Sequence, residues 1–115
     1  MALIATTRRY MFRSVHSLEV GDHREKIHGH QFWLEVSFDR AEIADVDRVV
    51  NEKIVSALDR HDLTGFIAPA TGERIVEWIH ERLDSTPLAK NILGVAIQET
   101  RKNRFVSARS VVQII

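Results

Sequence analysis

The sequence predicts an α+β domain in which an antiparallel sheet carries two helices on one face. Strand-like segments lie at both ends of the chain, and two segments with helical apolar spacing lie between them. No repeat, low-complexity stretch or linker interrupts this order of two strands, two helices and two strands. Such an order favours an antiparallel sheet covered on one side. A length of 115 residues suits a single domain, 1–115.

The first two strands are expected early in the chain. In Ala2–Phe12, Thr6 and Arg8 separate apolar side chains, which is typical of a strand. In His28–Phe38, the even positions from Phe32 onward are apolar, and alternate residues of a strand share one face.

The two helices are expected next. Asp45–Arg60 has apolar residues at helical spacing, with Asp45 as a candidate N-cap. Glycine and proline predict a loop over Asp62–Gly72. The second helix is expected over Gly72–Leu83, because apolar residues gather on one side and Pro87 lies beyond its end.

The last two strands are expected over Leu93–Thr100 and Phe105–Ile115, joined by the tight connection Arg101–Arg104. The final strand alternates through the apolar residues Val106 and Ala108. So small a sheet leaves exposed edges, which predicts association through them.

The composition excludes several classes of protein. The absence of cysteine excludes disulfides, thiolate zinc fingers and cysteine nucleophiles. A formal net charge of zero argues against a nucleic-acid-binding role. The apolar runs are too short for a membrane span, and threonine and arginine interrupt the N-terminal one, which makes a poor signal peptide. We therefore expect a cytoplasmic protein with neither nucleic acid nor membrane as partner.

Two histidines, His28 and His30, begin a strand face that continues as apolar core. Buried imidazole nitrogens need partners, and one metal ion satisfies both rings. His16 shares its parity with Phe12, so a hairpin of the first two strands would bring it opposite the pair. Three imidazoles with an open fourth position form a catalytic-type zinc site. The alternative is a chance pair of histidines in a strand.

This pattern resembles a known family. His16 followed by His28-Gly29-His30 is similar to the zinc triad of the 6-pyruvoyl-tetrahydropterin synthase family, which includes the 6-carboxy-tetrahydropterin synthases of queuosine biosynthesis. Further blocks extend the resemblance along the chain in the family's order: Phe12 with His16, Ile43 to Val46, Leu58-Asp59 with Leu63, Thr71 with Glu73, and Gln98-Glu99-Thr100.

The resemblance implies a tunnelling fold, or T-fold, in which sheets of neighbouring subunits join into a barrel. The implied homo-oligomer is a hexamer or another trimer-based assembly. The resemblance also implies Zn²⁺ on His16, His28 and His30, with 7,8-dihydroneopterin triphosphate or a close pterin as substrate. Glu99 would anchor the pterin, and Thr71 would bind substrate from an adjacent subunit.

The residues around Glu99 agree with this role. Val95, Ile97 and Glu99 share one strand face, so a carboxylate ends an apolar stripe. A carboxylate can accept two parallel N–H bonds from an aminopyrimidinone ring. The alternative is a glutamate turned to solvent beside Arg101 or Lys102.

The sequence departs from the family at the usual catalytic cysteine. Arg24 stands there, and Glu25 follows it, giving Glu25-x-x-His28-Gly29-His30. This resembles the subgroup in which a glutamate replaces the cysteine, which forms the folate precursor 6-hydroxymethyl-7,8-dihydropterin. Glu25 would be the general base and zinc the Lewis acid of a carbon–oxygen or carbon–carbon lyase. The alternative is an ordinary charged loop residue.

A second departure concerns the family's proton relay, an aspartate followed directly by a histidine. Here Arg60 follows Asp59, and His61 comes one position later, a rotation of about 100° on a helix. His61 therefore reaches the site only if the helix end unwinds, and Arg60 can instead hold a phosphate or carboxylate. Asp59 and His61 are candidate catalytic residues, and Arg60 is a candidate substrate-binding residue. Two other functions stay open: a pterin-binding homologue without catalysis, and a related enzyme with a different substrate.

Overall fold

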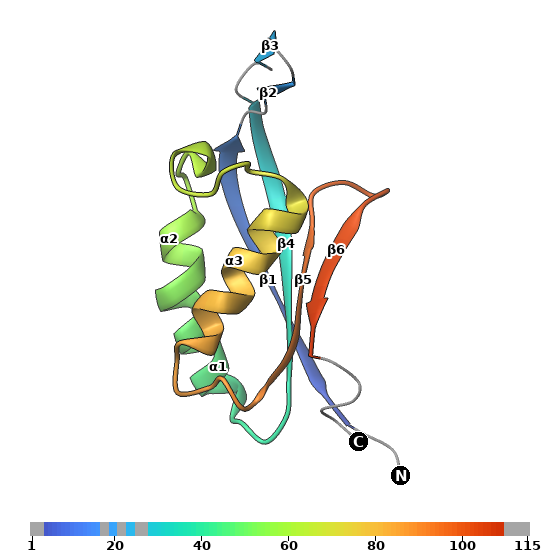
Figure 1. Cartoon of the computed structure of the whole chain (residues 1–115). Coiled ribbons are helices and arrows are strands. Elements are labelled where there is room, and N and C mark those ends of the chain that lie inside the picture. Colours follow the sequence, from blue (N-terminus) through green and yellow to red (C-terminus); the bar gives the residue numbers. More distant parts are fainter. Residues whose placement is uncertain (1–3, 17–18, 21–22, 25–27, 110–115) are drawn as a thin grey trace.

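The computed structural model describes residues 4–16, 19–20, 23–24 and 28–109. Four antiparallel strands form the main sheet, in the spatial order β1–β4–β5–β6 (Figure 1). Their bounds are β1 Thr6–His16, β4 His28–Phe38, β5 Ile92–Gln98 and β6 Arg104–Ala108. A second, two-stranded sheet joins β2 Glu19–Val20 to β3 His23–Arg24.

The helices lie on one face of the main sheet, as predicted (Figure 1). The first is continuous but changes type, from α1 Ile43–Val50 through a π-helical stretch, Asn51–Val55, to α2 Ser56–Leu58. A 3₁₀ turn, Leu63–Gly65, lies in the loop that follows, and α3 spans Gly72–Asp84.

The core fills the space between this sheet face and the helices. Even-numbered residues of β1 and β4 face inward, and the rings of Phe12 and Phe32 stack with centroids 5.1 Å apart. Ile75, Ile79 and Leu83 of α3 are fully buried against them. Each such apolar side chain contributes about 1.5–3 kcal/mol by leaving water, so the alternation in β4 fixes which sheet face receives the helices.

The first helix differs from its predicted bounds at both ends. It begins at Ile43 with Glu42 as N-cap, so the prediction of Asp45 as N-cap was wrong, and the backbone N–H of Asp45 donates to the Glu42 carbonyl. It ends at Leu58 because Asp59 has extended backbone angles, and Arg60 then takes a positive φ of 60°. This early ending frees residues 59–62 to run along the sheet.

The strand ends also differ from the prediction. β1 starts at Thr6 and continues to His16, four residues past the expected end, because the pairing with β4 continues to His28. β5 spans Ile92–Gln98, so Glu99 lies one residue beyond it. β6 begins at Arg104 and ends at Ala108. The part of the last predicted strand over 110–115 lies outside the described residues.

The side of β6 that faces the core is not the one that its apolar alternation predicted. Val106 is 56% exposed, whereas the half-buried Phe105 packs on the core. A side chain at Gly72 would collide with the Phe105 ring, so this glycine permits the close approach of β6 to α3. Ser107 is on the same inward parity, and its hydroxyl lies 2.7 Å from Nδ1 of the buried His80. The nearby strand, and not its own helix, buries His80.

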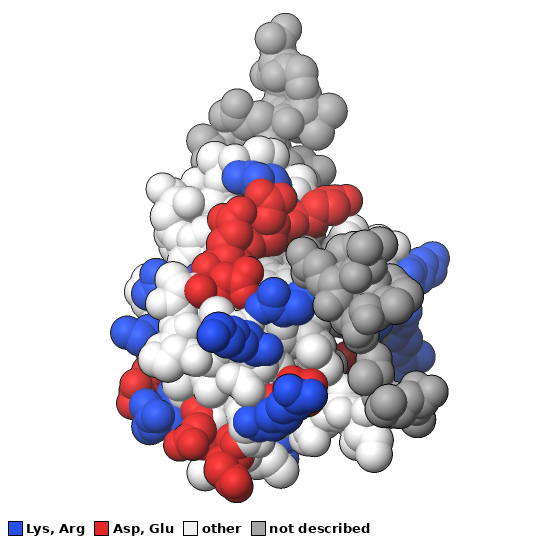
Figure 2. Space-filling view, turned by 60° about the horizontal axis from the view of Figure 1, so that its bottom comes forward, with Lys and Arg blue, Asp and Glu red and all other residues white. Residues whose placement is uncertain are grey.

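The surface carries charges of both signs. In the face shown in Figure 2, acidic side chains form a band between scattered lysine and arginine side chains. No extended basic area occupies this face, in keeping with a formal net charge of zero. No helix in the described part of the chain is long and apolar enough to cross a membrane.

Candidate functional site

The predicted zinc ligands lie near the end of the long ribbon formed by β1 and β4. The register pairs the Cα atoms of His16 and His28, and Ser14 pairs with His30 two residues away. The predicted hairpin therefore forms, with the three histidine backbones at one end of it. The side chains of His16 and His28, and the whole of Glu25, lie outside the described residues.

His30 is the member of the triad whose side chain the structure describes. It faces the helix side of the sheet, next to Phe32, and its ring contacts the Phe32 ring edge-on at 6.0 Å between centroids. Its Nε2 atom lies 3.1 Å from Oε1 of Glu99. The Glu99 side chain is only 21% exposed, so it is turned to His30 and not to solvent.

This contact arises from the register of the sheet. Leu34 pairs with Ile97, so Glu99 follows two residues later on the same side as Phe32 and His30. The predicted apolar stripe ending in a carboxylate is thus present, with Val95 and Ile97 each 1% exposed. A partly buried carboxylate beside an imidazole can either position the ring or bind a ligand's N–H groups.

Residues 59–62 lie along the outer edge of β1. The Arg60 N–H donates to the Arg13 carbonyl at 2.5 Å, and the Val15 N–H donates to the His61 carbonyl at 3.1 Å. A parallel bridge also joins Val15 to Asp62. The segment therefore occupies the edge of β1 near its C-terminal end, where a neighbouring strand would otherwise pair.

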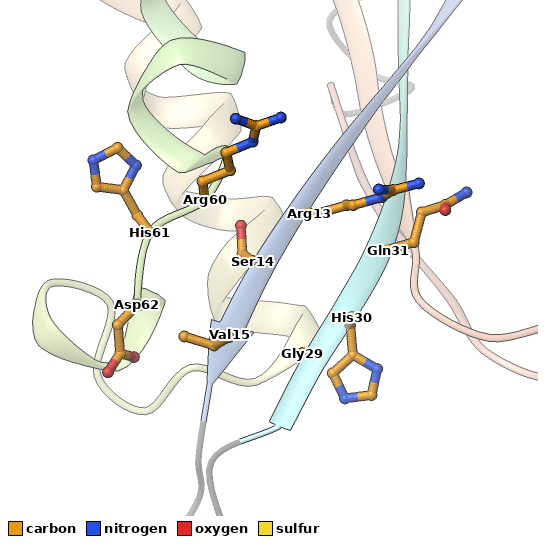
Figure 3. Close-up of a pocket in the computed structure, with 9 residues that line it drawn as sticks. All are labelled: Arg13, Ser14, Val15, Gly29, His30, Gln31, Arg60, His61 and Asp62. Atoms are coloured by element: carbon orange, nitrogen blue, oxygen red, sulfur yellow. The ribbon is translucent and has the colours of Figure 1, made fainter.

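Asp59 and His61 do not form a relay in this arrangement. The Asp59 carboxylate accepts the backbone N–H of Arg13 at 2.9 Å, so it completes the edge pairing. Nδ1 of the exposed His61 lies 2.8 Å from the Asp59 carbonyl oxygen. The rings of His61 and His30 point away from one another (Figure 3). Because the histidine stands one position later than in the family's Asp–His pair, its ring points away from His30.

A pocket of about 500 Å³ lies beside this segment (Figure 3). It is lined by residues 13–15 of β1, residues 29–31 of β4, and residues 60–62. Arg60, a predicted substrate-binding residue, belongs to this lining, as do Arg13 and Gln31. Gln31 was missed by the sequence reasoning; the available signal was its odd parity in β4, which it shares with Gly29.

Thr71, the other predicted substrate-binding residue, is the N-cap of α3. Its hydroxyl oxygen accepts the backbone N–H of Arg74 at 3.3 Å. The hydroxyl proton remains able to donate to a ligand. A role from an adjacent subunit stays a prediction.

Among the residues that the structure describes, no group of three His, Cys, Asp or Glu side chains is arranged to hold a metal ion. This finding does not reach the predicted triad, since two of its side chains lie outside that part of the chain. The donor set itself fits zinc, because three neutral imidazoles are a common ligand set for a catalytic zinc ion.

The comparison with protein families is decisive. The family model described as 6-pyruvoyl tetrahydropterin synthase matches residues 5–110 of the chain. The chain belongs to the 6-pyruvoyl tetrahydropterin synthase family. Membership supports a pterin-related synthase and an enzyme of the lyase type, and it fits a pterin substrate and an oligomeric assembly.

Solved structures of 6-pyruvoyl tetrahydropterin synthases share the fold. The Caenorhabditis elegans enzyme superposes with a TM-score of 0.81 at 20% identity, covering 96% of this chain and 98% of that one. The Plasmodium falciparum enzyme gives a TM-score of 0.68 at 12% identity, covering 93% of this chain and 99% of that one. A Plasmodium vivax enzyme with a catalytic glutamate replaced by alanine gives a TM-score of 0.70 at 12% identity, covering 94% of this chain and 99% of that one. The predicted T-fold is thereby confirmed for the single chain, and the barrel of neighbouring subunits stays a prediction. The comparison with curated proteins gives no match.

Proposed function

We propose that this chain is a zinc-dependent enzyme that cleaves the side chain of 7,8-dihydroneopterin triphosphate, or a close analogue, to 6-hydroxymethyl-7,8-dihydropterin. The observation that carries the proposal is the β1–β4 register, which gathers three histidine positions beside the carboxylate of Glu99. Family membership supports the pterin part of the proposal.

In this proposal His16, His28 and His30 hold the zinc ion. When bound, zinc supplies a Lewis acid that lowers the pKa of a coordinated hydroxyl group, as it lowers that of water to about 7. The contact between His30 and Glu99 fits such a site, because a carboxylate commonly orients a metal-ligating imidazole through its other nitrogen.

Glu99 anchors the pterin in this proposal. Its carboxylate is partly buried at the end of an apolar strand face, where water competes less for hydrogen bonds. Two parallel N–H donors of the pterin ring match its two oxygens. A ligand held there lies beside His30, so binding of the ring and chemistry at its side chain belong to one site.

Glu25 is the proposed general base. It stands three residues before His28, the first residue of β4. Glu25 would remove the proton of the second side-chain hydroxyl, whose carbon becomes an aldehyde as the bond to the first side-chain carbon breaks in a retro-aldol sense. The electron pair would pass to the first carbon and the pterin ring, and return of the proton from Glu25 to that carbon would give the hydroxymethyl group. The Plasmodium vivax enzyme in which a glutamate is catalytic supports this choice of residue type.

A pterin-binding homologue without catalysis is the second candidate, and one observation favours it. The Asp59 carboxylate is engaged by the Arg13 backbone, and the His61 ring points away from His30. An enzyme that required the Asp–His relay would be inactive with this geometry. A third candidate, a related enzyme with a changed substrate, would use Arg60 to bind an acidic group.

Association through sheet edges is part of the proposal. Residues 59–62 already pair with Arg13 and Val15, so among the described residues only the N-terminal half of the β1 edge has no paired segment. β6 forms the opposite edge of the sheet. Pairing of these two edges between copies of the chain would build a closed trimer-based ring. A cytoplasmic location stays a prediction.

The test is to incubate the zinc-loaded protein with 7,8-dihydroneopterin triphosphate and separate the products by chromatography. We expect 6-hydroxymethyl-7,8-dihydropterin from the wild type, its loss in Glu25→Gln, and its retention in Glu81→Gln, an exposed control on α3. Tight pterin binding without any product would favour the non-catalytic homologue. Turnover of a different pterin alone would favour the third candidate.

A further inference from the structure

Part of the lining of the pocket beside residues 59–62 comes from the sheet face that points away from the helices. Arg13 pairs with Gln31 across β1 and β4, and Val15 pairs with Gly29 two residues further along. Cross-strand partners share a face, and so do residues two apart in one strand. All four residues therefore lie on the face opposite His30, and Figure 3 shows Arg13 and Gln31 side by side, turned away from the His30 ring.

Arg13 differs from the other arginines of the sheet. Arg8 has Asp47 as its partner, while Arg9 and Arg104 both approach Glu35, at 3.8 and 2.5 Å. Within the described part of the chain, the Arg13 guanidinium has no carboxylate at ion-pair distance. Arg13 lines the pocket, and the lining also includes the carboxylate of Asp62.

Arg60 brings a second guanidinium to the same pocket. Its φ of 60° is a conformation that residues other than glycine and asparagine adopt at a cost. The hydrogen bond from its N–H to the Arg13 carbonyl holds this turn and keeps the two arginines together. Its side chain is 89% exposed, and its Asp59 contact is loose, at 3.8 Å. The chain thus keeps an arginine where glycine would fit the backbone better.

The two acidic groups nearby are both engaged. One oxygen of Asp59 accepts the Arg13 backbone N–H, and Oδ1 of Asp62 accepts the backbone N–H of Thr64. Neither carboxylate lies within hydrogen-bonding distance of a guanidinium in the pocket. The pocket therefore offers two cations, and the Gln31 carboxamide adds a neutral donor.

We propose that this pocket is an anion-binding site for a small molecule that carries a phosphate or carboxylate group, held by Arg13 and Arg60. Planar guanidinium groups bind both oxyanions with paired hydrogen bonds. The Gln31 carboxamide donates to the same oxyanion, and Val15 with Gly29 provides an uncharged floor. Glu99 does not belong to the lining of the pocket, and the proposed anion site does not rest on the proposed pterin chemistry.

The test is isothermal titration calorimetry of the zinc-loaded protein with three probes: inorganic phosphate, tripolyphosphate and citrate. Arg13→Gln and Arg60→Gly are the test variants. Arg101→Gln, in the loop after β5, is the matched control. Glycine is chosen at position 60 because it accepts a positive φ, so that the variant should unfold at the same temperature as the wild type or higher.

We expect at least one probe to bind with a millimolar or lower dissociation constant. Either test variant should weaken it about tenfold or more, as loss of one charge-assisted pair implies, whereas Arg101→Gln should bind like the wild type. Tighter binding of phosphate and tripolyphosphate would identify a phosphate site, and tighter binding of citrate a carboxylate site.

Three results would overturn the proposal. One is the absence of heat with all three probes. Another is equal affinity in the wild type and in the Arg13→Gln, Arg60→Gly double variant. The third is loss of anion binding in His28→Ala, which would assign the anion to the metal and not to the pocket. Glu99→Gln should leave the anion affinity unchanged, so failure of the pterin proposal and failure of this one remain distinguishable.

Discussion

The two ends of β1 differ in what surrounds their polar side chains. Near the N-terminal end, Arg8 and Tyr10 both bind Asp47 of α1; Arg8 contacts it through two nitrogens at 3.1 and 2.9 Å, and the Tyr10 hydroxyl donates at 2.6 Å. Near the C-terminal end, Arg13 faces a pocket and the histidine positions gather. The same strand thus stabilises the fold at one end and offers binding groups at the other.

The pKa values of the side chains near the N-terminal end of β1 follow from these contacts. The hydrogen bonds from Arg8 lower the pKa of the Asp47 carboxyl group, and the Tyr10 hydroxyl lowers it further. Burial raises the pKa of the Tyr10 phenol, with the neighbouring Asp47 adding to the rise. The pairing with Asp47 also raises the pKa of Arg8. Arg8 and Asp47 therefore stay charged at neutral pH, and each already has the other as its partner.

The largest effect is expected near the C-terminal end of β1, where the histidine positions lie. His28→Ala should abolish stoichiometric zinc binding, because two remaining imidazoles hold the ion far more weakly than three. Elemental analysis of purified protein measures the metal content. His61→Ala, whose ring points away from His30, is the control and should keep its zinc. Full metal content in His28→Ala would contradict the ligand assignment.

A smaller effect is expected for Glu99→Ala. Removal of a carboxylate that accepts two N–H bonds should weaken pterin binding about 30- to 150-fold, in line with about 2–3 kcal/mol for charge-assisted bonds. Fluorescence titration with a pterin measures the affinity, and metal analysis should show zinc retained. An unchanged affinity would assign Glu99 to the positioning of His30 alone.

The smallest effect is expected near the N-terminal end of β1, where Arg8 and Tyr10 bind Asp47. Asp47→Asn should lower the free energy of unfolding by about 1 kcal/mol, since the cluster is partly exposed, without changing zinc or pterin binding. Because folding lowers the pKa of Asp47, its stabilisation is present above the ordinary value of 3.8 and is lost as the pH falls through the lowered one.

Urea unfolding of both proteins at several pH values measures this difference. The gap between wild type and Asp47→Asn should be full near pH 7 and close in strong acid. A gap that persists unchanged in strong acid would show that the Asp47 charge does not stabilise the fold. Loss of ligand binding in Asp47→Asn would contradict the division between the two ends of β1.

Some strands and helices have the bounds and faces that the sequence predicted, and others do not. The strand His28–Phe38 has the predicted bounds, because alternation over eleven residues specifies both length and inward face. Helix α3 begins at Gly72 as predicted. The order of motifs also led to the family that the comparison then showed. The N-cap at Asp45 and the inward face of β6 were wrong, because short segments carry little periodic signal and their partners decide the outcome.

The sequence by itself determined the order of the main strands and helices, the fold class, the family and the parity that aligns His30, Phe32 and Leu34, since these depend on local spacing. Only the tertiary structure decided that residues 59–62 occupy the edge of β1, that β6 buries His80, and that Glu99 meets His30. These contacts join residues about 27 to 69 positions apart. Local patterns cannot specify such pairs, because each depends on which distant backbone and side-chain groups compete for the same hydrogen bonds.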